Sequence, residues 1–104
     1  MAPATMRSTG LTIDAAAREA TVRGHAIALT NQEFELLLVL ATGRGIVWSR
    51  EMLIESAWRH DSYVTVATVD AVVAALRRRI ERDAHNPKFL LGDADSGYWL
   101  VDVD

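Results

Sequence analysis

The fold is decided by residues 65–82, which read TVATVDAVVAALRRRIER. Apolar residues recur in this stretch at offsets of 0, 4, 7 and 11, namely Val69, Val73, Leu76 and Ile80. An α-helix turns about 100° per residue, so these four positions lie within about 40° of one line along its surface. The spacing predicts a helix over residues 68–82, capped by Thr65 or Thr68. We expect Asn86-Pro87 to end it, because the residue before a proline is pushed out of helical space.

The opposite side of this predicted helix has a bare first half and a basic second half. Its residues are Ala67, Ala71, Ala74, Ala75, Arg78 and Arg82, with Arg77 and Arg79 at the flanks. Residues 68–83 contain four arginines and three acidic residues, which gives a local charge of +1. These arginines can form a local patch that binds nucleic acid. They can also be a solvated helix end, where the helix dipole favours cations, and the charge pattern alone leaves both interpretations open.

The chain before this helix predicts a small sheet and two shorter helices. Alternation typical of half-buried strands occurs in residues 11–13, 20–22 and 26–29. Thr30 and Glu33 have the spacing of a capping box, so a first helix should begin there. Ser49 is expected to cap a second helix that ends near Trp58, and residues 59–67 are expected to form a loop.

The chain after this helix predicts a β-hairpin. Residues 89–91 and 98–101 have the pattern of strands, and the Gly- and Asp-rich residues 92–97 join them. Residues 1–10 show no periodicity and are expected to form a disordered lead. The predicted fold class is therefore α+β, with a single domain over residues 11–104.

Composition narrows the classes of function. The chain has 104 residues, no cysteine and a net charge of −3, so neither disulfides nor thiolate metal sites nor a global positive field are expected. No apolar run approaches the roughly 20 residues that span a bilayer, and the N-terminus does not resemble a signal peptide, which makes the cytoplasm the expected location. The histidines share no metal-ligand spacing, and the sequence contains no phosphate loop. We therefore expect no enzyme, no metal and no cofactor.

The order of these motifs resembles the winged-helix effector domain of OmpR/PhoB-type response regulators. The matching pieces run in the family's order from residue 11 to 101: Leu29-Thr30 through Glu33 with Leu36-Leu37, Ser49-Arg50-Glu51 with Leu53, Trp58, Thr68-Val69-Asp70, Leu76-Arg77-Arg78 and Gly97-Tyr98. The resemblance implies a winged helix-turn-helix with a small N-terminal antiparallel sheet, three helices and a C-terminal hairpin wing. It also implies that the third helix is the recognition element in the major groove.

The resemblance further implies particular DNA contacts, and the chain departs from some of them. Positions that contact phosphates in the family are matched by Arg50, Trp58 and Arg77. Positions at which the family has further basic side chains are Ala67, Val72, Ala74 and Ala75 here. The wing arginine is replaced by Ala94, and residues 89–104 carry four aspartates and no basic residue. Phosphate should repel this hairpin and tail.

We therefore predict a DNA-binding domain of a transcriptional regulator, which docks residues 68–82 in a major groove with weak or atypical readout. The predicted DNA-contacting residues are Arg50, Trp58, Thr68, Arg77, Arg78 and Arg82. Phosphate contacts of this kind position a protein without specifying sequence. Effector domains of this family usually follow a receiver domain, so the resemblance implies that partner as well, and a homodimer is left open.

A second hypothesis is a degenerate winged helix that serves as a protein-interaction or dimerisation module without sequence-specific DNA binding. Strand alternation that buries Tyr98 and Leu100 should turn Trp99 outward, and exposed tryptophans are enriched at interfaces. Ala74 and Ala75 would let another surface approach closely. A Trp99 that only covers the hairpin is an equally good explanation of this residue.

Overall fold

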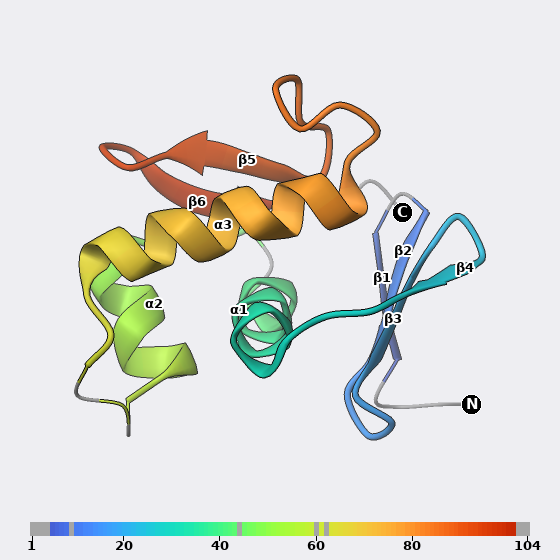
Figure 1. Ribbon diagram of the computed structural model, residues 1–104, viewed down its shortest axis with the longest axis horizontal. Coiled ribbons are helices and arrows are strands. Elements are labelled where there is room, and N and C mark those ends of the chain that lie inside the picture. Colours follow the sequence, from blue (N-terminus) through green and yellow to red (C-terminus); the bar gives the residue numbers. More distant parts are fainter. Residues whose placement is uncertain (1–4, 9, 44, 60, 62, 102–104) are drawn as a thin grey trace.

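The computed structural model describes residues 5–8, 10–43, 45–59, 61 and 63–101. The elements follow one another as β1 (Thr5–Ser8), β2 (Leu11–Asp14), β3 (Glu19–Val22), β4 (His25–Ile27), α1 (Asn31–Thr42), α2 (Arg50–Ala57), α3 (Val66–Ile80), β5 (Leu90–Asp93) and β6 (Gly97–Leu100). Figure 1 shows the N-terminal sheet on one side of α1, α2 on the other side, and the β5–β6 hairpin lying along α3. This order confirms the predicted sheet, helices and hairpin.

The N-terminal sheet has four antiparallel strands in the order β1-β2-β3-β4, one more than the alternation predicts. The extra strand corrects the expectation of a disordered lead over residues 1–10, because Thr5–Ser8 pair with β2 from Thr5 opposite Asp14 to Ser8 opposite Leu11. The edge of β2 would otherwise present unpaired N–H and C=O groups, which favours the pairing. Residues 1–4 and 9 of the predicted lead lie outside the described residues.

The caps of the first two helices are those that the sequence predicts. The Thr30 hydroxyl accepts the N–H of Glu33 at 3.2 Å, and the Glu33 carboxylate accepts the N–H of Thr30 at 3.0 Å. The Ser49 hydroxyl accepts the N–H of Met52 at 3.1 Å at the start of α2. Helix α1 ends at Gly43, where a β-carbon would overlap the Trp48 ring. These local contacts fix where both helices begin and how α1 ends.

Helix α3 contains the predicted buried stripe but differs at both ends from residues 68–82. Val69, Val73, Leu76 and Ile80 are all at most 1% exposed. The helix begins at Val66 and ends at Ile80, with Glu81 already in an extended conformation. The Asn86-Pro87 pair therefore does not set its end. The cause is the buried Glu81 carboxylate, which accepts the N–H groups of Lys88, Phe89 and Leu90 and so turns the chain back early.

The hairpin joins the same core. β5 and β6 pair antiparallel, with Leu90 opposite Leu100 and Gly92 opposite Tyr98. Trp48, before α2, adds a bridge to Tyr98 through N–H to O hydrogen bonds of 2.8 Å in both directions. Buried side chains of the sheet, the three helices and the hairpin form one cluster. Within the described part of the chain, no helix is long and apolar enough to cross a membrane.

Candidate nucleic-acid interface

The side of α3 that faces away from the core is open along its length. Ala67, Ala71, Ala74 and Arg78 are exposed on it, and Arg82 is exposed just beyond the helix. We call these five residues the outer face. Among the described residues, none makes a hydrogen bond or an ion pair with the side chain of Arg78 or Arg82. Both guanidinium groups can therefore bind an anion without breaking an internal contact.

Arg77 has different surroundings from its neighbour Arg78. Its Nε donates to the carbonyl of Leu90 at 3.0 Å, and its Nη2 donates to the carbonyl of Gly92 at 2.9 Å. Its guanidinium carbon lies 5.7 Å from the centre of the Tyr98 ring, within the range of a cation–π contact. Arg77, predicted from the resemblance as a phosphate contact, thus ties α3 to the hairpin.

Arg50, the second predicted phosphate contact, belongs to a network that joins α2, α3 and β6. Its Nη1 lies 3.0 Å from Oδ2 of Asp70, and the hydroxyl of Tyr98 donates to Oδ1 of the same carboxylate at 2.8 Å. Tyr98 is only 4% exposed. Burial, reinforced by the hydrogen bond to Asp70, raises the pKa of Tyr98 to about 12. The network holds α3 in a fixed orientation to the hairpin.

Two further residues from the predicted set, Trp58 and Thr68, have roles inside the fold. Trp58 is 7% exposed, and its indole Nε1 is buried without a hydrogen-bond partner in the described structure. The Trp58 side chain packs into the core at the end of α2, so its predicted role as a DNA contact gains no support from its placement. Thr68 is half-buried, and its hydroxyl accepts the N–H of Thr65 at 3.2 Å, which is a capping role.

The tip of the hairpin is acidic and well ordered by its own hydrogen bonds. Asp93 accepts the N–H groups of Asp95 and Ser96 at 3.0 and 2.7 Å. The hydrogen bond from the Ser96 N–H is the main cause that lowers the pKa of Asp93. Asp93 and Asp95 are exposed on either side of Ala94. The tip thus presents negative charge at the point where the resemblance implies an arginine.

Trp99, Ala74 and Ala75 are not brought onto one surface. Tyr98 and Leu100 are buried and Trp99 is half-buried, so the alternation predicted for β6 is confirmed. Trp99 lies on the face of the strand opposite to Tyr98, whose hydroxyl reaches α3. Ala74 is exposed and Ala75 half-buried on α3 itself. The Trp99 ring also lies over Gly92, where a β-carbon would come within 2.9 Å of Cζ3.

The network of Arg50, Asp70 and Tyr98 is the feature that sequence reasoning missed. The three residues are separated by 20 and 28 positions, so no local pattern reports their contact. Their only signal is that each falls in a motif of the family resemblance. The part of the chain that the structure describes contains no group of three or more His, Asp or Glu side chains able to hold a metal ion.

The sequence matches a known family over most of its length. Residues 24–100 match the family described as transcriptional regulatory protein, C terminal. The chain belongs to this family. Its members are the OmpR/PhoB-type effector domains, DNA-binding regulators of transcription, so the predicted resemblance is confirmed.

Solved structures of OmpR/PhoB-type proteins share the fold. The response regulator DrrB of Thermotoga maritima, an OmpR/PhoB homologue, has a TM-score of 0.85 and 33% identity over 94% of this chain. The DNA-binding domain of RstA from Klebsiella pneumoniae, in complex with the RstA box, has a TM-score of 0.79 and 27% identity over 93% of this chain and 96% of its own. The CpxR DNA-binding domain of E. coli gives 0.76 and 25% over 96% and 98%.

These similarities set the class of the fold and the extent of the match. The relatives are winged-helix DNA-binding domains, so the hairpin of β5 and β6 is the wing of this fold. The chain covers only 44% of the length of DrrB. It therefore corresponds to less than half of that response regulator.

Proposed function

We propose that the chain binds double-stranded DNA by placing the outer face of α3 in a major groove, with Arg78 and Arg82 on backbone phosphates. The observation that carries this proposal is the contrast between these two exposed guanidinium groups, which no described residue engages, and the internal contacts of Arg77. Arginine can bind a phosphate through two parallel N–H donors, so each exposed guanidinium suits a backbone contact.

Arg50 and Arg77 assist in this proposal mainly by position. Each uses part of its guanidinium within the protein, Arg50 toward Asp70 and Arg77 toward the wing carbonyls. Each is also half-buried rather than fully buried, so the remaining N–H groups contribute positive charge beside the groove. Thr68 lies at the first turn of the helix and is a secondary contact.

The proposed readout is dominated by shape and backbone. Alanines at positions 67, 71 and 74 present no hydrogen-bonding group to a base edge and can contact only a thymine methyl. A good bidentate contact between a side chain and a base contributes about 1–3 kcal/mol of discrimination, and the outer face lacks such contacts along its first half. The acidic wing tip adds repulsion rather than a minor-groove contact. We therefore expect weak sequence discrimination.

The test is fluorescence anisotropy of a labelled random-sequence duplex at several salt concentrations. A plot of the logarithm of the association constant against the logarithm of salt concentration should have a slope of about −2 to −4, as expected for a few phosphate contacts. Ala71→Glu should weaken binding by roughly tenfold or more, because it places a carboxylate in the groove. Ala16→Glu makes the same change in the exposed turn between β2 and β3 and serves as the control. No binding by the parent chain at the lowest salt would overturn the proposal.

A second candidate function, a protein-interaction or dimerisation module, draws its support from Trp99. This side chain is half-buried on the wing face turned away from Tyr98, opposite the half-buried Leu91 of β5. Under this candidate, Trp99→Ala should abolish self-association in sedimentation velocity while the circular dichroism spectrum stays that of the parent. The receiver domain implied by the family would be a partner in either case, since the chain covers less than half of DrrB.

A further inference from the structure

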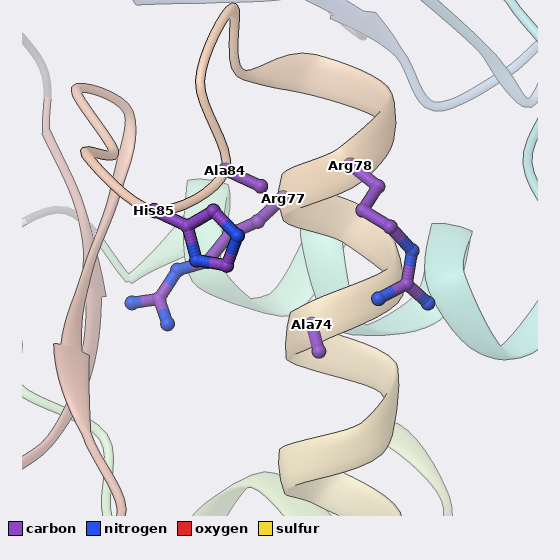
Figure 2. Close-up of a pocket in the computed structure, with 5 residues that line it drawn as sticks. All are labelled: Ala74, Arg77, Arg78, Ala84 and His85. Carbon is purple, nitrogen blue, oxygen red and sulfur yellow. The ribbon is translucent and has the colours of Figure 1, made fainter.

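A notch of about 300 Å³ lies beside the C-terminal half of α3, next to the outer face (Figure 2). Its lining consists of Ala74, Arg77 and Arg78 from the helix and Ala84 and His85 from the loop that follows. In Figure 2, Arg77, His85 and Ala84 lie on one side of the helix and Arg78 on the other, with Ala74 one turn below. The notch therefore has basic walls and a small apolar floor.

The loop that carries His85 is held in place by two carboxylates. At its base, the buried Glu81 carboxylate accepts the N–H groups of Lys88, Phe89 and Leu90 at 2.7 to 3.0 Å. Within it, Oδ1 of Asp83 accepts the N–H of His85 at 3.0 Å, and the carbonyl of Asp83 accepts the N–H of Asn86 at 3.0 Å. These bonds form a turn that keeps the imidazole beside the helix.

The chemistry of the lining favours an anion with several oxygen acceptors. None of the five lining residues is acidic, and the nearby Asp83 uses its carboxylate on a backbone N–H. Arg77 donates from Nε and Nη2 to the wing, and its Nη1 has no hydrogen-bond partner among the described residues. Arg78 has an uncommitted guanidinium, and an imidazole can supply an N–H donor in either charge state. Donors of this kind on two sides of the notch suit a phosphate group.

We propose that this notch is a subsite for one backbone phosphate of bound duplex DNA, contacted by Arg78 and His85, with Arg77 behind them. The inference rests on the proposed function and adds to it a contact from outside the recognition helix. The small side chains of Ala74 and Ala84 leave room for the phosphate, which longer side chains at these positions would fill. A loop residue that no helix pattern reports thus extends the interface beyond α3.

The experiment compares variants in the anisotropy titration of the random-sequence duplex. His85→Ala should weaken binding roughly three- to tenfold, because a phosphate loses a donor. His85→Arg should bind at least as tightly as the parent, with a salt slope steeper by about one than that of His85→Ala. Ala84→Glu, which places a carboxylate in the notch away from the outer face, should weaken binding by roughly tenfold or more. His25→Ala, at an exposed histidine of β4, is the matched control and should bind as the parent does.

The outcomes separate this subsite from the function on which it rests. If the parent binds and Ala71→Glu weakens binding, but His85→Ala and Ala84→Glu bind as the parent does, the subsite is overturned and the proposed function stands. If the parent shows no binding, both are overturned. Circular dichroism of each variant checks that a loss of binding does not come from a loss of fold.

A second measurement distinguishes a backbone phosphate from free phosphate. In proton–carbon correlation spectra, a short duplex should shift the ring signals of His85 and the methyl signal of Ala84 and leave the ring of His25 unchanged. Inorganic phosphate should compete with the duplex for these signals only in large excess. If inorganic phosphate shifts the His85 signals and the duplex does not, the notch takes a free anion and the assignment to the DNA backbone is wrong.

Discussion

Helix α3 has an inner side, which faces α2 and the wing, and the outer face. The two differ in how many internal contacts their side chains make. On the inner side, Asp70 receives Arg50 and Tyr98, and Arg77 donates to two wing carbonyls. On the outer face, three exposed alanines precede Arg78, and no described residue makes a hydrogen bond or an ion pair with the guanidinium of Arg78. The two arginines are neighbours in sequence, yet one belongs to the fold and the other to the surface.

This contrast separates the geometry of the winged helix from the ability to read a DNA sequence. Proteins that share the fold need not share both properties. The residues that orient α3 against α2 and the wing are present and paired, so the geometry of a winged helix is retained. In the proposed docking, the positions that would face base edges are alanines, which offer no hydrogen-bonding group, while Arg78 and Arg82 remain available for backbone contacts. A test of the domain should therefore measure stability and DNA binding independently for the two sides of α3.

The largest expected effect is the alkaline loss of stability from Tyr98 on the inner side. A tyrosine pKa raised from 10.0 to about 12 means that the folded state holds its proton more tightly than the unfolded state. The associated stability is fully present below pH 10 and is lost as the pH rises through 12. Two pKa units correspond to about 2–3 kcal/mol. Urea unfolding of the parent between pH 9 and pH 12 should show a decrease of about that size.

The other tyrosine supplies the matched control for this effect. Tyr63 is 91% exposed, so Tyr63→Phe should keep the alkaline decrease, whereas Tyr98→Phe should remove it. Ten of the eleven basic residues are arginines, which do not titrate in this range, so the difference between the two variants reports mainly Tyr98. Equal decreases in both variants would contradict the buried hydrogen bond to Asp70.

The next effect in size contrasts Arg77 with Arg78. Arg77→Ala should lower the free energy of unfolding by about 1–2 kcal/mol, because two wing carbonyls lose a charged donor. Arg78→Ala should change it by less than about 0.5 kcal/mol, since it removes no internal contact. DNA binding should show the reverse order, with the larger effect from Arg78→Ala. This variant should reduce the magnitude of the salt slope by about one. Chemical unfolding and anisotropy on the same samples measure both quantities.

Reversed results would break the contrast between the two sides of the helix. If Arg78→Ala destabilises the fold as much as Arg77→Ala, the outer face is not free of internal contacts. Arg79→Ala is a useful reference, because Arg79 lies in the same turn and its Nε donates to the buried Glu33 carboxylate at 2.7 Å. Its loss should resemble that of Arg77 in stability and not that of Arg78.

Most of the fold could be predicted because it is determined by local patterns. The capping box of Thr30 and Glu33 and the apolar stripe of α3 each lie within a few turns of chain, and both are confirmed. The strand Thr5–Ser8 could not be predicted, since it depends on an edge of β2 that exists only in the assembled sheet. The end of α3 depends on Glu81, whose carboxylate binds backbone groups seven to nine residues later.

The candidate site was harder to predict from the sequence, because it too depends on contacts between residues that are distant in the chain. Sequence places Arg77 and Arg78 side by side with equal charge, and only tertiary contacts of Arg77 with the wing carbonyls and the Tyr98 ring distinguish them. Trp58 matches a motif position, but its burial follows from how α2 packs on the core. No sequence pattern links His85 to α3. Its place beside the helix depends on a loop whose base is held by the Glu81 carboxylate. The charges could be assigned from the sequence. Which charged side chains contact the protein and which face solvent depends on tertiary contacts.

The smallest expected effect comes from extending the outer face to the wing. Ala94 is exposed at the tip between Asp93 and Asp95, at the position where the family resemblance implies an arginine. Ala94→Arg should tighten binding to the random duplex roughly three- to tenfold at low salt and steepen the salt slope by about one, because one more phosphate is neutralised. Stability should stay within about 0.5 kcal/mol of the parent, since residue 94 lies on the surface. Ala94→Gln, of similar length without the charge, is the control and should leave the slope unchanged. If Ala94→Arg binds no better than Ala94→Gln, the wing tip does not approach the duplex, and α3 together with its following loop carries the interface alone.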